Sequence, residues 1–300
     1  MKNFIVDSRY LNPLTDFGFH RLFGTESCKE LLIDFLNEII KEEGLITDIQ
    51  YLPPEQLGDT ETDRRAIFDI FCVNEKGDYF IVEMQKAKQP YFRDRSLFYV
   101  SFPIRMQAPK GIWDYRLKAV YLVTVLDFVL FNEFEEDKEQ FIESVHLVRE
   151  RTKTMFSKKL NFVFIELPKF KKTEEELVTN AEKWLFILKN LSQLEERPLS
   201  LQGKVFETLF QLAEIKQLTK EDMEAYRKSI LKYQDVRSAV DLAREEGREE
   251  GREEGIEKGI EKGRKVEKIS IIQKCLQNNL PIEVIINLTG FSKEQILQIR

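Results

Sequence analysis

Residues 66–86, AIFDIFCVNEKGDYFIVEMQK, decide the fold. Two apolar runs, AIFDIFCV and YFIVEMQK, flank the polar segment NEKGD, which is the pattern of a β-hairpin. A turn symmetric about Lys76 places Asp69 opposite Glu83, and opposed residues of a ladder share one face. Strand alternation predicts two faces, one with Ile67, Asp69, Phe71, Val73, Tyr79, Ile81, Glu83 and Gln85 and the other with Phe68, Ile70, Cys72, Phe80, Val82 and Met84.

The two acids of this hairpin need an explanation, because both faces of the strands are apolar. Such strands belong inside a domain, where an unpaired carboxylate is costly to bury. Neighbouring carboxylates repel each other unless they share a proton or bind a cation. An exposed position for both acids at the strand ends is the alternative. We favour the cation, and carboxylate oxygens suit Mg²⁺, which supports the cleavage of phosphodiesters.

An Asp at the end of an apolar strand, followed after a turn by Glu-x-Gln on a second strand, resembles the active site of the PD-(D/E)xK nuclease superfamily. Within it, the chain resembles the Rpn family of recombination-promoting nucleases, also described as PD-(D/E)xK family transposases. The resemblance covers most of the chain. The motifs that carry it are TDFGFHRLFG at residues 15–24, LLIDFLNEII at 31–40, the FDI and VEMQ cores, and the charged, glycine-spaced C-terminal segment.

The resemblance implies an α/β fold of the restriction-endonuclease-like kind, with a mixed sheet flanked by helices and a helical C-terminal extension. It implies Asp69 and Glu83 as ligands of Mg²⁺ or another divalent cation and Asp16 as an additional acid on the first helix. It also puts Gln85 where the superfamily usually has Lys. Because an amide brings no charge and cannot act as a base, this departure puts the rate in doubt rather than the reaction class. Asp16 also has a purely structural explanation, as an acid in the first turn of a helix capped by Thr15.

Composition excludes several classes of site and of protein. The 300 residues are 42% hydrophobic and include 23 Phe, enough for a substantial core. Three unpaired Cys and two His give little support to a disulfide framework, a zinc site or a His-based triad. No secretory signal is evident, and the apolar run at residues 119–131 is short and broken by Asp127. We therefore expect a cytoplasmic protein that does not contact membranes.

Charge is segregated along a chain whose net charge is −6. Residues 84–118 carry eight basic and two acidic residues, and so do residues 149–172. A basic stripe beside the acids suits a DNA backbone, although a solvated helix face explains the same counts. The candidates for phosphate contacts are Arg93, Arg95, Arg64 and Arg65.

Hydrophobic periodicity and the positions of Gly, Pro and capping residues predict the remaining helices and strands. Helices are expected from Asp16, over residues 28–42 and over 91–107, where Pro103 kinks or ends the helix. Strands are expected at 46–52, 116–131, 144–151 and 161–167, and residues 55–65 read as a loop. Further helices are expected from Thr173, at 201–216 and at 220–233. The predicted organisation is a nuclease-like core at 1–172, a helical extension at 173–236, a charged Gly-repeat linker or helix at 237–268 and a small helix-turn-helix-like tail at 269–300.

The repeat REEGREEGREEGIEKGIEKGRK at residues 244–265 leaves two structures open. Charged pairs three residues apart favour a helix, but each interior Gly costs ~1 kcal/mol relative to Ala. A solvated linker is the simpler outcome. The other is a helix whose glycines let a second copy approach, which would make the C-terminal segment a homodimer contact.

These features predict a metal-dependent DNA endonuclease of low sequence specificity that acts in recombination or transposition. A noncatalytic nuclease-fold protein that binds DNA or oligomerises is the alternative. A metal-dependent phosphatase acting on a smaller ester is a weaker third reading, since the basic stretches favour a polyanion.

Overall fold

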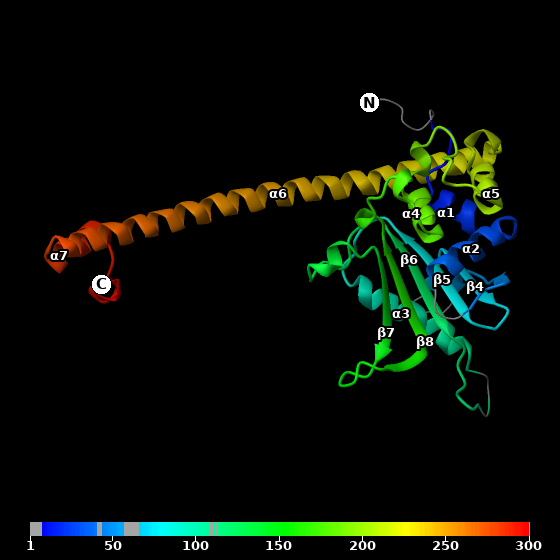
Figure 1. The fold of residues 1–300 in the computed structure, drawn as a ribbon, viewed down its shortest axis with the longest axis horizontal. Helices are drawn as coiled ribbons and strands as arrows, with labels where there is room; N and C mark the ends of the chain where they lie inside the picture. The colour runs from blue at the N-terminus through cyan, green and yellow to red at the C-terminus, as the bar shows by residue number, and fades with distance from the viewer. Residues whose placement is uncertain (1–7, 41–43, 57–65, 109–110, 112, 300) are drawn as a thin grey trace. The chain divides into compact units, whose positions relative to one another are not determined.

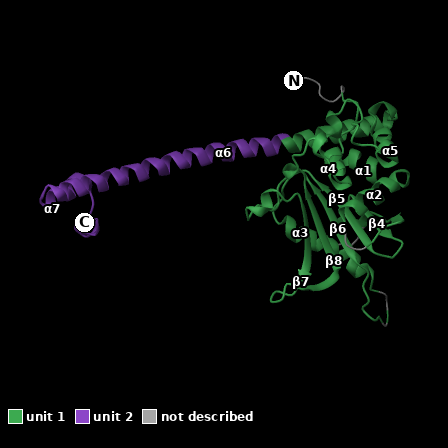
Figure 2. Ribbon diagram, in the orientation of Figure 1, with its two compact units in different colours: residues 1–237 green, residues 238–300 purple. Residues whose placement is uncertain are grey.

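The computed structural model describes residues 8–40, 44–56, 66–108, 111 and 113–299. The chain forms two compact units, residues 1–237 and residues 238–300 (Figure 2). The elements of the first unit are α1 (Asp16–Phe23), α2 (Lys29–Ile39), β1 (Ile49–Tyr51), β2 (Glu55–Gln56), β3 (Ala66–Ile67), β4 (Ile70–Asn74), β5 (Tyr79–Gln85), α3 (Phe92–Met106), β6 (Val120–Leu126), β7 (Ile142–Val148), β8 (Met155–Glu166), α4 (Asn180–Asn190), α5 (Lys204–Ala213) and the beginning of α6 (Lys220–Gln277).

A six-stranded mixed sheet in the order β1-β4-β5-β6-β8-β7 is the centre of this unit (Figure 1). The hairpin β4-β5 is antiparallel, whereas β5, β6 and β8 run parallel to one another. Helix α3 makes the crossover from β5 to β6, as parallel strands require. The predicted fold class, a restriction-endonuclease-like mixed sheet flanked by helices, is confirmed.

The register of the hairpin is the one expected from a turn centred on Lys76. Ile70 pairs with Val82 and Val73 with Tyr79, so Asp69 and Glu83 occupy the next opposed positions. The Asn74 side-chain oxygen fixes the turn by accepting hydrogen bonds from the main-chain N–H groups of Lys76 (3.0 Å) and Asp78 (2.8 Å). Gly77 adopts φ +84°, a conformation that glycine reaches without strain.

The first strand of the predicted hairpin is broken, which corrects part of the predicted face pattern. The chain bends at Asp69, and residues Ala66–Ile67 pair with β2 in a separate two-stranded sheet. Strand alternation does not continue across this bend. Phe68 therefore packs with Phe71 and Phe102 instead of sharing the face of Ile70, and Ile67 is 64% exposed. The pairing of β2 also turns the beginning of the expected 55–65 loop into strand; residues 57–65 lie outside the described part of the chain.

Helices cover both faces of the sheet with separate hydrophobic cores. Helices α1, α2, α4, α5 and the first turns of α6 pack on the face that carries Ile70, Val82 and Met84. Helix α3 packs on the opposite face, where Phe71 and Ile81 are buried. Glu83 lies two residues after Ile81 on β5, so the two side chains share a face of the sheet, the one covered by α3.

Several boundaries differ from those predicted from the sequence. Helix α3 continues through Pro103 to Met106, so the proline does not end it early. Thr173 begins only a 3-10 turn, Glu174–Glu176, and the following α-helix is capped by Thr179. In the part of the chain that the structure describes, no helix has an apolar stretch long enough to span a bilayer.

The second unit contains the rest of α6, α7 (Ile282–Thr289) and α8 (Lys293–Gln298). Its small core joins one isoleucine from each helix, Ile272, Ile285 and Ile296. Ser292 caps α8 through the predicted capping box with Gln295. The glycine repeat is helical throughout, which differs from the solvated linker favoured by the sequence.

We expect alanine to stabilise the repeat. A Cβ added at Gly251, Gly255 or Gly259 meets no atom within 4 Å, so each substitution gains helix propensity of ~1 kcal/mol without a clash. The triple variant should slow amide hydrogen exchange in residues 244–265 and raise helicity on circular dichroism.

Gly18→Ala serves as the opposite control. A Cβ added at Gly18 would overlap the carbonyl oxygen of Asn12, so this substitution should lower the melting temperature. Faster exchange in the triple variant would contradict the expectation and would favour a close approach of another chain at the glycines.

Candidate active site

The hairpin end holds two carboxylates by reciprocal hydrogen bonds. The main-chain N–H of Asp69 donates to Glu83 Oε1 (3.2 Å), and the main-chain N–H of Met84 donates to Asp69 Oδ2 (2.7 Å). Each acid is therefore bound by the backbone of the opposite strand, beyond the last ladder pair, Ile70 with Val82. Glu83 is 3% exposed, whereas Asp69 is exposed as a residue at the bend, although protein surrounds most of its carboxyl group. The two predicted metal ligands thus lie side by side.

Both carboxyl groups are less acidic than usual. Burial raises the pKa of Glu83, and the neighbouring charge of Asp69 raises it further. Burial also raises the pKa of Asp69, an effect that the N–H of Met84 opposes and the negative charge of Asp16 reinforces. The pair therefore holds a proton to a higher pH than isolated carboxyls do.

Gln85 extends the polar group along β5. Its amide Nε2 donates to Glu83 Oε2 at 3.0 Å. A small cavity of about 10 Å³ lies against Glu83, Gln85 and Thr124, close to the volume occupied by one water. Thr124 is paired with Glu83 across β5 and β6, and its buried hydroxyl has no hydrogen-bond partner among the residues that the structure describes. The cavity thus offers polar groups on several sides.

Asp16 approaches the pair from the other side of the sheet. It is the first residue of α1, whose N-cap Thr15 accepts a hydrogen bond from Gly18 N, as predicted. Its carboxylate binds Lys86 Nζ at 2.6 Å and Lys232 Nζ at 2.8 Å. Although burial would raise the pKa of Asp16, these two ammonium groups outweigh it and lower the pKa. Asp16 influences Asp69 through its charge and is engaged by two cations.

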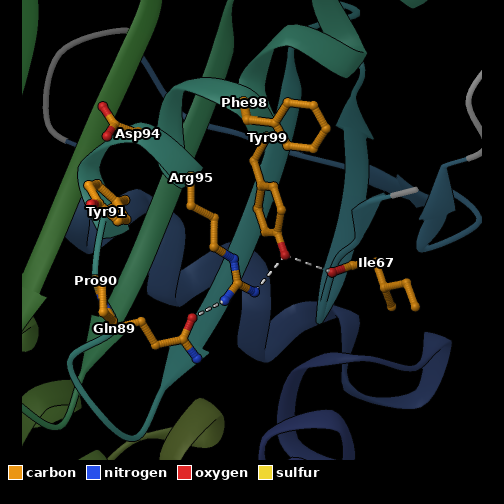
Figure 3. A pocket seen from close by; sticks show the side chains of 8 residues that line it. All are labelled: Ile67, Gln89, Pro90, Tyr91, Asp94, Arg95, Phe98 and Tyr99. Carbon is orange, nitrogen blue, oxygen red and sulfur yellow. Dashed lines mark hydrogen bonds between the residues drawn. The ribbon is translucent and has the colours of Figure 1, made fainter. Parts of the chain in front are cut away.

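Of the two described arginines predicted to contact phosphate, only Arg95 lies near the acid pair. Arg95 lies on the acid pair's side, where its charge lowers the pKa of both Asp69 and Glu83 against the effect of burial. Its guanidinium donates to Gln89 Oε1 (2.7 Å) and to the Tyr99 hydroxyl (2.5 Å), as Figure 3 shows. Arg93 is directed elsewhere, to Glu133 Oε1 at 2.5 Å and to the ring of Phe131.

Arg64 and Arg65 lie outside the described residues, so their proposed contacts stay predictions.

The donor set fits a divalent cation held largely by water. Among the described residues, no group of three or more His, Cys, Asp or Glu side chains is arranged to bind a metal. The available donors are two carboxylates and the amide oxygen of Gln85, all hard oxygen atoms. Mg²⁺ is commonly bound through one or two carboxylates while it keeps several waters. Each hydrogen-bonded carboxylate oxygen retains a second lone pair for such a ligand.

Some neighbours of the acid pair were not identified as site residues from the sequence. Lys86 directly follows Gln85, and in the sequence it is one of eight basic residues between 84 and 118, with no signal that separates it from the others. Thr124 and Lys232 are distant in sequence, and a single chain contains no signal of their position. Only the parallel pairing of β6 and the docking of α6 bring them to the site.

Comparison with protein-family profiles matches residues 13–243 to the family described as PD-(D/E)XK nuclease family transposase. The same searches find no matching curated protein and no matching solved structure.

The raised pKa of Glu83 makes stability depend on pH. In the unfolded chain this carboxyl ionises near its ordinary pKa of 4.5, whereas in the fold it keeps its proton to higher pH. The folded state then binds more protons, so its contribution to stability falls as pH rises above about 4.5. Glu83→Gln should remove this loss, and without metal its gain over the parent should grow by about 1 kcal/mol or more between pH 5 and pH 8 in urea unfolding.

Glu75→Gln is the matched control at the other end of the hairpin. There, main-chain N–H groups outweigh slight burial and lower the pKa, so the pH trend should be reversed or absent. Parallel pH profiles for Glu83→Gln and the parent would show that Glu83 is not buried as described.

Proposed function

The chain belongs to the PD-(D/E)XK nuclease family transposases, and on this premise we propose that it is a divalent-metal-dependent DNA endonuclease of low sequence specificity. The family supports a nuclease-like or transposase-like role with DNA as the partner. The observation that carries the finer proposal is the opposed pair Asp69 and Glu83, with Gln85 hydrogen-bonded beside it. A structural role alone gives no reason to keep two repelling acids there. We include in the proposal a role in recombination or transposition and a cytoplasmic location.

The proposed mechanism assigns separate tasks to the residues of the site. Asp69 and Glu83 would hold the cation, for which Mg²⁺ is our choice, and a bound cation would polarise the phosphate and lower the pKa of an attacking water. Gln85 would orient that water through its amide. Arg95 would neutralise charge on the phosphate from the α3 side. Asp16 would assist by its charge and by holding Lys86 near the reacting groups.

Low sequence specificity is part of the proposal because the groups at the site recognise phosphate and metal rather than base edges. Lys86, Arg95 and Lys232 are proposed to meet phosphates, and contacts to phosphates carry no sequence information. A homodimer through residues 237–268 is proposed as well, since helix α6 presents Ile256 and Ile260 as exposed side chains.

Plasmid cleavage tests the nuclease. We expect the parent to nick plasmid DNA with Mg²⁺ or Mn²⁺ and not in EDTA. Asp69→Asn and Glu83→Gln should each lower the rate roughly 100-fold or more, because several kcal/mol of charge stabilisation would be lost. Gln85→Ala should slow the reaction less, since it removes orientation and leaves both carboxylates.

Glu75→Gln, an exposed acid on the same hairpin, should cleave at the parental rate. Failure of the folded parent to cleave with any divalent ion, together with salt-sensitive DNA binding, would favour the noncatalytic DNA-binding alternative. Equal cleavage by Asp69→Asn and the parent would remove Asp69 from the site.

Binding of the cation should release protons. Carboxylates must ionise to bind a metal, and burial raises the pKa of both acids. Isothermal titration calorimetry with Mg²⁺ at neutral pH should therefore give heats that differ between PIPES and Tris, whose ionisation enthalpies differ. Glu83→Gln should release fewer protons than the parent. Identical heats in the two buffers would mean that the bound ion does not displace a proton from this pair.

A further inference from the structure

A groove runs beside the candidate site along the N-terminal half of α3 (Figure 3). Its walls are the loop from β5 to α3, the first turns of α3 and, across the gap, Ile67 of β3. Its volume of about 680 Å³ is that of a typical small-molecule site. None of the tasks in the proposed mechanism uses the aromatic part of this groove.

The groove adjoins the small cavity beside the acid pair, and two side chains form the wall that they share. Arg95 and Tyr99 line both the groove and the small cavity that contains Glu83 and Gln85. The Tyr99 hydroxyl accepts a hydrogen bond from Arg95 and lies 3.5 Å from the carbonyl oxygen of Ile67. A strand whose phosphate reaches Arg95 would therefore extend its next nucleotides into the groove.

The residues that line the groove are better suited to contact the bases of a nucleic acid than its phosphate backbone. Arg95 and Asp94 contribute one positive and one negative charge, so the groove lacks the positive surplus of a duplex-binding surface. Apolar surface predominates instead. Tyr91 is 81% exposed and Phe98 is 39% exposed, and such rings stack on bases of any sequence. The faces of bases are available only where they are unpaired.

Tyr91 is held in an unusual backbone conformation. It adopts φ 59° and ψ 30° at the N-cap of α3, without a side-chain capping bond. A bulky residue is uncommon in this left-handed region, where Gly or Asn is the ordinary choice. The large exposed side chain therefore has no explanation in the local fold of the loop.

We propose that this groove binds unpaired bases next to the scissile phosphate, so that the substrate is DNA that presents unpaired bases at the cut: a single strand, a frayed end or a locally opened stretch of a supercoiled plasmid. The proposal rests on the proposed nuclease function for the position of the phosphate. Tyr91 and Phe98 stack on bases, while Arg95 binds the phosphate that enters the acid pair.

Binding without cleavage tests the groove. Fluorescence anisotropy in EDTA compares the full chain on fluorescein-labelled oligothymidylate, on an abasic strand of equal length and charge, and on duplex DNA. We expect oligothymidylate to bind about tenfold more tightly than the abasic strand, the size expected from base stacking. Tyr91→Gly and Phe98→Ala should each lower affinity for oligothymidylate about tenfold and leave affinity for the abasic strand unchanged.

Tyr115→Gly is the matched control. Tyr115 has φ 58° and is 78% exposed, so it shares residue type, backbone conformation and exposure with Tyr91, but it lies outside the groove. Glycine suits both positions, so neither variant should unfold. Tyr115→Gly should bind oligothymidylate like the parent.

Three results would overturn the proposal that the groove binds unpaired bases. They are equal affinity for oligothymidylate and the abasic strand, tighter binding of duplex than of single strand, or equal losses of affinity for Tyr91→Gly and Tyr115→Gly. The nuclease proposal fails separately. If the parent cleaves nothing but Tyr91-dependent binding persists, the groove stands without the nuclease. If metal-dependent plasmid cleavage occurs without Tyr91-dependent binding, the nuclease stands without the groove.

Discussion

The described site depends on one constraint: two carboxylates held together where a hairpin ladder ends. Asp69 and Glu83 are bound by each other's strand, and both bonds come from main-chain N–H groups that the ladder itself positions. Because the register of β4 and β5 sets where these N–H groups lie, a slip of the ladder by one residue would break the opposition of the two acids. The fold therefore keeps two like charges close together at a cost in free energy, and a shared proton or a bound cation would remove that cost.

Positive charge reaches this pair from two sides of the sheet. Arg95 arrives on α3 and is held by Gln89 and Tyr99, whereas Lys86 and Lys232 arrive on the side of α1 and are held by Asp16. Asp16 thus serves two interactions at once. It holds two ammonium groups beside the acid pair and fixes the first turns of α6 near it. The beginning of the long helix is in this way part of the site's electrostatic balance.

The sequence predicted the centre of the fold better than its periphery, for physical reasons. A turn built on Asn74 and Gly77 sets the pairing of the two strands, so the opposition of Asp69 and Glu83 follows from local residues alone. The bend before Ile70 accompanies pairing with β2, which no local pattern indicates, and for that reason strand alternation predicts the wrong face for Phe68. Thr124 and Lys232 depend on tertiary pairing. The helix through the glycine repeat contradicts propensity, which is a weak guide where charged pairs recur at each turn.

Gln85 determines how the charge of the site is balanced. A Lys at this position would place an ammonium beside Glu83, favour its ionised form and lower its pKa. The amide of Gln85 donates one hydrogen bond to Glu83 and adds no charge, so burial and Asp69 raise the pKa of Glu83 without that opposition. The distant charge of Arg95 compensates only in part. The acid pair with Gln therefore has a greater need for a proton or a cation than the same pair with Lys. Replacing Lys by Gln would thus couple the proposed binding of a cation more strongly to pH.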